Sequence, residues 1–188
     1  VGLYKPMTIK PFYFNPYREC TYVVWDEQKQ NHKALLVDAG MYGEAEEKRM
    51  ADFLTKESLS PIALLITHTH PDHICGVNFM QRMYGVEPII CPPEGALQIP
   101  NFDGIEVLHT PGHKEDSVCY YWRAQGCVFT GDTLFKDSIG RTDLAGGDMP
   151  TLIHSLDKLK QLPNDTIVYP GHGYPTTIGR EKQYNPYL

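Results

Sequence analysis

The stretch Thr67-His68-Thr69-His70-Pro71-Asp72-His73 follows directly after the apolar run of residues 62–66. It places three imidazoles and one carboxylate within six positions, 68–73. Neutral imidazole and carboxylate are good ligands for divalent zinc or iron, and so dense a polar set is costly to bury without a cation. Because the stretch lies where a buried strand opens into a loop, it predicts a metal site.

The composition is typical of one folded domain covering residues 1–188. The chain is 41% hydrophobic and 11% aromatic, and its length is sufficient for a sizeable core. The formal net charge of -6 argues against broad nucleic-acid binding, which depends on neutralising phosphates with Lys and Arg. No apolar run reaches the roughly 20 residues of a membrane helix, so we expect no membrane partner either.

The cysteines favour a cytoplasmic protein with reduced thiols. There are five, an odd number, and none forms a C-x-x-C pair. Cys75, two residues after His73, could ligate zinc, but the His and Asp residues already suffice for two sites. The start shows no signal-peptide pattern, and since the chain begins at Val1, the native N-terminus stays open.

The chain alternates between strand and helix patterns. Stretches rich in β-branched or aromatic residues, bounded by turn formers, predict strands at 7–14, 20–26, 33–37, 62–66, 88–91, 105–109, 118–122, 127–130 and 166–169. Helical spacing of apolar residues predicts helices at 44–56, 74–84 and 152–162. This order suits helices packed outside two sheets in one α/β domain.

Three more candidate ligands each follow an apolar run. His113 ends V-L-H-T-P-G-H, Asp132 ends C-V-F-T-G-D, and His172 lies in I-V-Y-P-G-H-G. Taken alone, such a histidine is more often structural, and a Gly-Asp pair is more often a turn. Together with the 68–73 cluster they share one setting, the exit of a strand, where α/β scaffolds build their sites. The sequence therefore predicts a shared metal centre.

The motifs H-x-H-x-D-H, T-P-G-H, G-D-T and G-H-G closely resemble those of the metallo-β-lactamase superfamily, in the family's order between Asp38 and His172. The resemblance implies an α/β fold, a four-layer αβ/βα sandwich, with two divalent metal ions at one edge of its sheets. The implied ligands of the first ion are His68, His70 and His113. Those of the second ion are Asp72, His73 and His172, with Asp132 bridging the two.

This ligand set implies hydrolysis by a metal-bridging hydroxide. Two cations lower the pKa of a shared water enough to give hydroxide near neutral pH. Asp72 and Asp132 are the candidate catalytic residues, with Asp72 as acceptor of the nucleophile's proton. Asp38 resembles the family's strand-end aspartate, which orients a ligand histidine. Zinc is the expected metal, and iron and manganese also suit these ligands.

Within the superfamily the chain resembles glyoxalase II, because the second site uses an Asp-His pair and no cysteine. The segment after Asp132 and the tail 176–187 resemble that family, but Tyr174-Pro175 stands where its C-terminal helical domain would be inserted. The chain is thus similar to short bacterial hydroxyacylglutathione hydrolases. These convert S-D-lactoylglutathione to D-lactate and glutathione, which completes methylglyoxal detoxification. Lys136 and Arg141 are candidate partners for a substrate carboxylate.

Three alternatives stay open. A persulfide dioxygenase would hold one iron with His68, His113 and Asp132, a two-histidine-one-carboxylate set. A lactonase would use the same dinuclear centre on an ester. A non-catalytic binding protein would keep the metal without turnover. The loaded metal, the acyl group, the thiol and the oligomeric state are not decided by the sequence.

Overall fold

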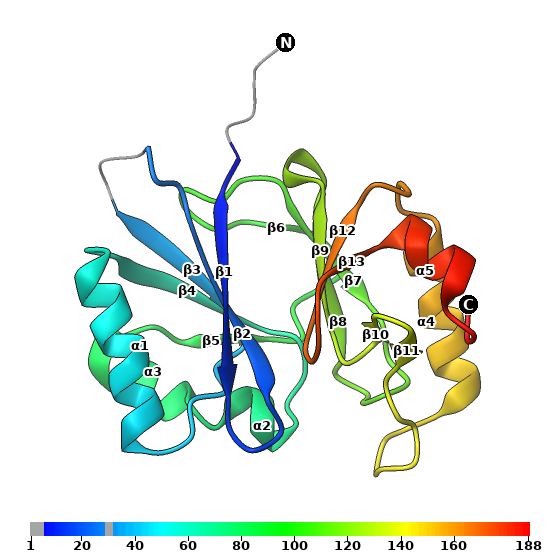
Figure 1. Cartoon of the computed structure of the whole chain (residues 1–188), viewed down its shortest axis with the longest axis horizontal. Helices are drawn as coiled ribbons and strands as arrows, with labels where there is room; N and C mark the ends of the chain where they lie inside the picture. Colours follow the sequence, from blue (N-terminus) through cyan, green and yellow to red (C-terminus); the bar gives the residue numbers. More distant parts are fainter. Residues whose placement is uncertain (1–5, 29–31) are drawn as a thin grey trace. The chain divides into compact units, whose positions relative to one another are not determined.

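The computed structural model describes residues 6–28 and 32–188. It divides into two compact units. The first contains Val1–Ile66, His70–Ile89 and Ile99–Phe102, and the second contains Thr67–Thr69, Ile90–Gln98 and Asp103–Leu188. Each unit has a mixed sheet and its own helices (Figure 1). The expected single domain over residues 1–188 stays a prediction.

The first unit is built on a five-stranded sheet in the order β1-β2-β3-β4-β5. Its strands are β1 (Thr8–Phe14), β2 (Glu19–Trp25), β3 (Lys33–Val37), β4 (Ser60–Ile66) and β5 (Pro88–Ile90). Strands β3 and β4 are parallel, and a parallel pair needs a crossover connection. Helix α1 (Glu44–Lys56) supplies it. Two further helices follow β4, α2 (Pro71–Ile74) and α3 (Val77–Tyr84).

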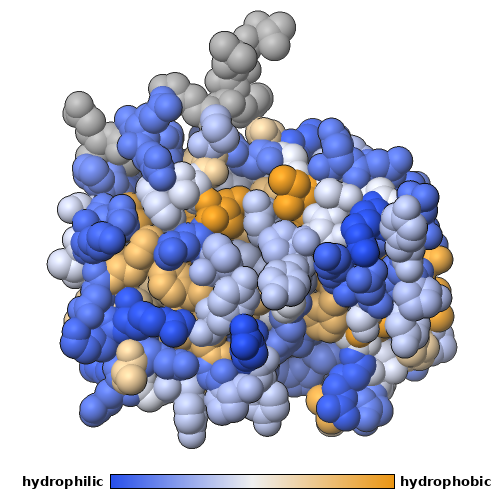
Figure 2. All heavy atoms as spheres, in the orientation of Figure 1, coloured by the Kyte–Doolittle hydropathy of each residue, from blue (hydrophilic) through white to orange (hydrophobic). Residues whose placement is uncertain are grey.

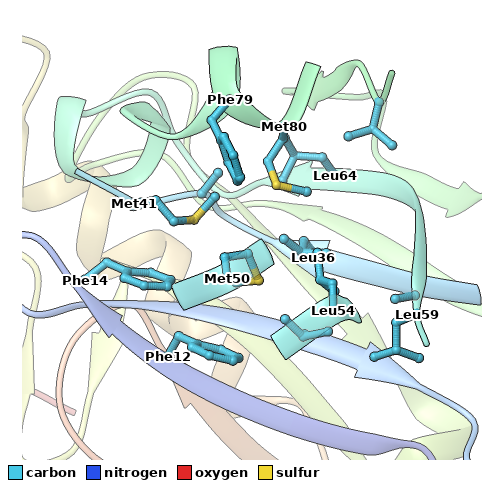
Figure 3. Packing of buried hydrophobic residues seen from close by; sticks show 14 of the residues in the cluster. Phe12, Phe14, Leu36, Met41, Met50, Leu54, Leu59, Leu64, Phe79 and Met80 are labelled. Carbon is cyan, nitrogen blue, oxygen red and sulfur yellow. The ribbon is translucent and has the colours of Figure 1, made fainter. Parts of the chain in front are cut away.

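Helices α1 and α3 cover one face of this sheet (Figure 1). Met50 of α1 and Met80 of α3 are both fully buried and belong to one cluster with Leu36 and Leu64 of the sheet (Figure 3). Burying an apolar side chain of this size stabilises a fold by about 1.5–3 kcal/mol. The packing therefore fixes the ends of β3 and β4, where Asp38 and the His-rich stretch begin.

The second unit is built on a six-stranded sheet in the order β13-β12-β9-β8-β7-β6. Its strands are β6 (Gly95–Leu97), β7 (Ile105–His109), β8 (Val118–Trp122), β9 (Cys127–Gly131), β12 (Ile167–Pro170) and β13 (Thr176–Thr177). The unit also contains a small hairpin formed by β10 (Leu134–Phe135) and β11 (Ser138–Ile139). Its helical elements are η1 (Arg123–Gln125), α4 (Met149–Lys160) and α5 (Ile178–Tyr184). Leu152, Leu156 and Leu159 of α4 pack with Val128 of the sheet.

Three strands of the second unit end at the same edge of its sheet. Strand β7 is antiparallel to β8, β8 is antiparallel to β9, and β9 is parallel to β12. Strands β7, β9 and β12 therefore run in one direction. Their carboxyl ends are the three strand exits that precede His113, Asp132 and His172.

The predicted strands are confirmed, and the differences concern short elements and boundaries. The helix predicted at 74–84 is confirmed as α3 over Val77–Tyr84, and only its start is wrong, because residue 74 ends the separate short helix α2. Helix α4 begins before residue 152, since Asp148 caps it by accepting a hydrogen bond from the Thr151 N–H at 3.0 Å. Strands β6, β10, β11 and β13 have two or three residues, too few for a periodic pattern.

The surface of the protein is mainly polar on the face shown (Figure 2). The face drawn in Figure 2 carries mostly hydrophilic residues, with smaller apolar areas between them. Over the described part of the chain, the helices are all too short or too polar to cross a membrane.

Candidate metal centre

Four of the predicted ligands lie together in the second unit, around one carboxylate oxygen. Asp132 Oδ2 lies 3.7 Å from His68 Nε2, 3.4 Å from His113 Nε2 and 3.4 Å from His172 Nε2. The His68 and His113 rings meet edge to face, with centroids 5.0 Å apart. Asp132, His68 and His113 are buried and His172 is partly exposed. Three imidazole nitrogens thus converge on one acidic oxygen.

The sheet of the second unit explains this convergence. Asp132 directly follows β9, and His172 lies two residues after β12. The Gly171 N–H donates a hydrogen bond to the Gly131 carbonyl at 2.8 Å, which holds the two exits side by side. His113 lies in the connection between β7 and β8. Side chains distant in sequence meet because their strands end at one edge.

The ring orientations leave Nε2 of His68 and His113 facing Asp132, as the atom available to a metal ion. His113 Nδ1 lies 2.8 Å from the Arg141 carbonyl oxygen, and since a carbonyl accepts, Nδ1 carries the proton. Thr67 Oγ1 lies 3.0 Å from His68 Nδ1. A hydrogen bond at the outer ring nitrogen is typical of metal-ligating histidines. An imidazole lone pair facing a carboxylate oxygen is stabilised by a cation between them, so this donor set fits a divalent metal.

The backbone packs tightly behind these ligands at Gly140. A Cβ at this position would lie 1.8 Å from the Asp132 carbonyl oxygen and 3.1 Å from His113 Cβ. No side chain fits without moving the Asp132 backbone. The segment after the small hairpin therefore helps to fix both the carboxylate and the imidazole.

The other predicted ligands lie in the first unit, within one helical turn. His70 caps α2, and its carbonyl accepts a hydrogen bond from the His73 N–H at 3.0 Å. His73 Nε2 lies 3.4 Å from Asp72 Oδ2. His73 Nδ1 lies 2.7 Å from Asp38 Oδ2, and both residues are buried. This is the carboxylate–histidine pairing expected of an aspartate that orients a metal ligand.

Asp38 holds this position in an unusual backbone conformation. Its φ is 62°, in the left-handed region that few residues other than glycine adopt. The Asp38 N–H donates a hydrogen bond to the Leu65 carbonyl at 2.7 Å, which ties the end of β3 to β4. Aspartate and asparagine tolerate this region better than most residues.

Glu19 is a carboxylate beside His73 that the sequence interpretation missed. It is fully buried at the start of β2, with Oε1 3.8 Å from His73 Nδ1. The Thr21 hydroxyl donates to it at 2.8 Å, and a Cβ on Gly40 would lie 1.8 Å from its Oε2. Glu19, Asp38 and His73 each offer a ligand atom, all within 4.8 Å of one another. The signal overlooked was a charged residue heading an otherwise apolar strand.

A pocket of about 430 Å³ opens beside His172 in the second unit. The residues that line it are Phe135, Lys136, Asp137, His172, Gly173 and Tyr174. The Phe135 ring meets the His172 ring edge to face, with centroids 6.0 Å apart. Lys136 is exposed and adds a positive charge to this wall. Asp137 on the same wall is paired with Arg180 at 2.7 Å, so Lys136 can face the anionic group of a ligand that also has an apolar part.

The Arg141 guanidinium, predicted to bind a substrate carboxylate, forms an ion pair with Asp143. Its Nε and Nη2 each lie 2.7 Å from an Asp143 carboxylate oxygen, in an exposed bidentate pair. Hydrogen bonds from Arg141 lower the pKa of the Asp143 carboxyl to about 2. The group of Arg141 that contacts a predicted metal ligand is its backbone carbonyl, which accepts the hydrogen bond from His113. Substrate binding by its guanidinium stays a prediction.

The thiols are poor ligand candidates. All five cysteines lie in the described chain, and none of them forms a disulfide. Burial raises the pKa of the Cys75 thiol to about 11, and that of the Cys119 thiol to about 12. The Cys75 thiol donates to the Gly40 carbonyl at 3.2 Å. These observations support the choice of His and Asp ligands over Cys75.

Comparison with known proteins identifies the family of the chain. Residues 20–106 and 87–172 match the family model of the metallo-beta-lactamase superfamily. The chain belongs to this superfamily. It is therefore a hydrolase-type enzyme of a superfamily that binds divalent metals, and the resemblance seen in the sequence motifs is confirmed.

Solved structures confirm the predicted α/β metallo-β-lactamase fold. The crystal structure of BLEG-1 B3 metallo-beta-lactamase is 32% identical, with a TM-score of 0.89 over 96% of this chain and 99% of that one. TTHA1623 in a di-iron-bound form is 30% identical, with a TM-score of 0.83 over 95% and 100%. Among curated sequences, the hydroxyacylglutathione hydrolase GloC of Haemophilus influenzae is 34% identical over 88% of this chain and 91% of its own.

Proposed function

We propose that this enzyme hydrolyses glutathione thioesters, with S-D-lactoylglutathione as substrate and D-lactate and glutathione as products. The observation that carries the proposal is the match with a hydroxyacylglutathione hydrolase over most of the length of both chains. The partner is thus a small molecule with a thioester, a peptide-like body and carboxylates.

The proposed ligands divide between two metal ions. His68, His70 and His113 would hold the first ion, Asp72, His73 and His172 would hold the second, and Asp132 would be shared by both. Support for the bridge comes from Asp132 Oδ2, which lies within 3.7 Å of His68, assigned to the first ion, and 3.4 Å of His172, assigned to the second. Zinc is our first choice, and the di-iron form of TTHA1623 makes iron the second.

Bound divalent ions would supply hydroxide near neutral pH and polarise the thioester carbonyl. The chain's own residues do the rest. The Asp72 carboxylate, partly exposed beside His73, accepts the proton as the nucleophile adds to the carbonyl. Asp38 and the Arg141 carbonyl keep the imidazoles of His73 and His113 in one orientation.

The pocket beside His172 would hold the glutathione part of the substrate. Phe135 and Tyr174 offer apolar contact to its backbone, and Lys136 can pair with one of its carboxylates. The thioester carbon would then lie on the Asp132 side of His172. An exposed cation of this kind contributes on the order of 0.2–1 kcal/mol, so it selects among thioesters more than it drives binding.

A second candidate is a mononuclear iron persulfide dioxygenase. His68, His113 and Asp132 form a two-histidine-one-carboxylate set within the second unit, which suits oxygen chemistry at iron. His172 argues for the hydrolase, because its Nε2 lies as close to Asp132 Oδ2 as that of His113 does. A single-iron site does not need this fourth donor.

A substrate panel with metal quantitation tests the proposal. Protein purified without added metal is analysed for zinc, iron and manganese, and assayed on S-D-lactoylglutathione, an acyl lactone, a β-lactam and glutathione persulfide. We expect two metal ions per chain and the fastest turnover on the thioester. One iron per chain with oxygen uptake on the persulfide would overturn the hydrolase. Fastest turnover on the lactone or β-lactam would overturn the thioester specificity.

A further inference from the structure

The pocket wall beside His172 is carried by a hairpin that is too short to hold its own shape. Strands β10 and β11 pair through Leu134↔Ile139 and Phe135↔Ser138. Such a two-stranded hairpin is not stable by itself in water. Leu134 and Ile139 are buried in the core of the second unit, which fixes the base of the hairpin. The tip, which lines the pocket, needs another anchor.

Helix α5 provides the anchor through hydrogen bonds to the backbone of the tip. The Asp137 N–H donates to Glu181 Oε1 at 2.6 Å. Asn185 Nδ2 donates to the Ser138 carbonyl at 3.0 Å and to the Phe135 carbonyl at 3.4 Å. The Asn185 amide nitrogen also lies 3.2 Å from Glu181 Oε1. Glu181 of α5 and Asn185, the residue that follows α5, therefore hold the tip of the hairpin together.

Glu181 is a buried carboxylate, and both of its oxygens accept hydrogen bonds. It has 0% of its surface exposed. Oε2 accepts from the Thr176 hydroxyl and from Arg180 Nη1, the latter at 2.9 Å. Arg180 Nη1 also lies 2.7 Å from Asp137 Oδ1. Asp137 is therefore bound through its backbone N–H by Glu181 and through its carboxylate by Arg180. These contacts hold it at a φ of 64°, in the left-handed region that residues with a Cβ rarely adopt.

We propose that Glu181 is a positioning residue for substrate binding: through the Asp137 N–H it sets the place of Phe135 and Lys136 beside His172. The inference rests on the proposed function, because it assigns this pocket to the thioester's thiol part. Glu181 lies on α5, in the C-terminal segment 176–187, which carries none of the metal ligands. Its loss should therefore raise KM and leave both kcat and metal content unchanged.

The test compares three variants by KM, kcat, bound metal and amide hydrogen exchange of residues 134–139. Glu181→Ala removes the acceptor of the Asp137 N–H. Glu181→Gln can keep a carbonyl toward that N–H and turn its amide toward Thr176, so only the Arg180 contact is lost. Leu159→Ala, fully buried in the same core cluster, is the control for lost stability.

We expect Glu181→Ala to raise KM for S-D-lactoylglutathione about tenfold, with kcat within about twofold and faster exchange at 134–139. Glu181→Gln should restore KM to within about twofold of the parent, and Leu159→Ala should leave KM unchanged. If Glu181→Ala does not fold, Asn185→Ala, which frees the Phe135 and Ser138 carbonyls, should raise KM in its place.

An unchanged KM in both Glu181→Ala and Asn185→Ala, or an equal rise in Leu159→Ala, would overturn the inference. Failure of the proposed function looks different, because the parent protein would then show no thioester turnover. In that case exchange at residues 134–139 still decides the anchoring role, and protection equal to the parent's in Glu181→Ala would refute it.

Discussion

Replacing Asp38 by asparagine should weaken metal binding at His73 without disturbing the fold. Asp38 Oδ2 lies 2.7 Å from His73 Nδ1, and both side chains are buried. Asparagine keeps an acceptor oxygen and tolerates the left-handed φ of 62°. The substitution therefore removes the negative charge that raises the basicity of the imidazole and changes little else.

The size of the effect follows from this contact. Losing an outer carboxylate partner of a ligand histidine costs about 10- to 100-fold in metal affinity, equivalent to about 1.4–2.7 kcal/mol. Asp38→Ala should also destabilise the fold, because a left-handed φ costs other residues about 1–2 kcal/mol. Glu19, with Oε1 3.8 Å from the same nitrogen, can take over part of the role. A Glu19→Gln/Asp38→Asn double variant should thus lose more metal than either single variant.

The assay is a zinc titration of chelator-stripped protein against a competing indicator dye, alongside thermal unfolding of the stripped protein. We expect Asp38→Asn to keep one ion tightly and to bind the second about 10- to 100-fold more weakly. The unfolding temperature of the metal-free protein should stay close to that of the parent. Two ions held with unchanged affinity would refute the orienting role. A lower unfolding temperature without metal would show that Asp38 acts on the fold instead.

Three further results are expected. Asp132→Ala should remove both metal ions and reduce thioester hydrolysis to background, as measured by metal analysis and an absorbance assay; full activity would disprove the ligand assignment. Lys136→Ala should raise KM by about two- to fivefold at low salt, because an exposed ion pair contributes about 0.2–1 kcal/mol, and a larger rise in Arg141→Ala would favour the guanidinium instead. Burial raises the pKa of the Glu181 carboxyl, but four hydrogen bonds lower it further, so that the pKa lies below its usual 4.5. The donors are Thr176, the Asp137 N–H, Arg180 and Asn185. The stabilisation from the Glu181 carboxylate is therefore fully present above pH 4.5 and lost on acidification. Glu181→Gln should accordingly weaken the dependence of the free energy of unfolding on pH in urea titrations below about pH 5, and a dependence equal to the parent's would contradict this.

The positions where strands end were predictable from the sequence, because long apolar runs define buried strands. Residues 127–130 and 166–169 read as buried strands, and each is followed by a glycine turn and a metal-ligand type. Parallel pairing of β9 with β12 then brings Asp132 and His172 together. The local sequence could indicate each candidate ligand, and the pairing of the strands places these candidates next to one another.

The support around the ligands could not be predicted in the same way. The tip of the β10–β11 hairpin takes its place from Glu181 and Asn185, more than forty positions away in sequence. Glu19 looks like an ordinary strand-end charge until β2 is seen to be buried along its whole length. By contrast, the start of α4 was within reach, since Asp148 followed by Pro150 is a capping pattern.

The hydrogen bond from His113 Nδ1 to the Arg141 carbonyl has a consequence for mutational scanning. A backbone acceptor survives almost every substitution of its own side chain. A scan of single replacements would therefore score position 141 as tolerant, although the ligand ring depends on it. Deletions or insertions between Ser138 and Arg141 would displace the carbonyl and reveal the dependence. For the orientation of His113, the spacing of this segment therefore matters more than the identity of the side chain at position 141.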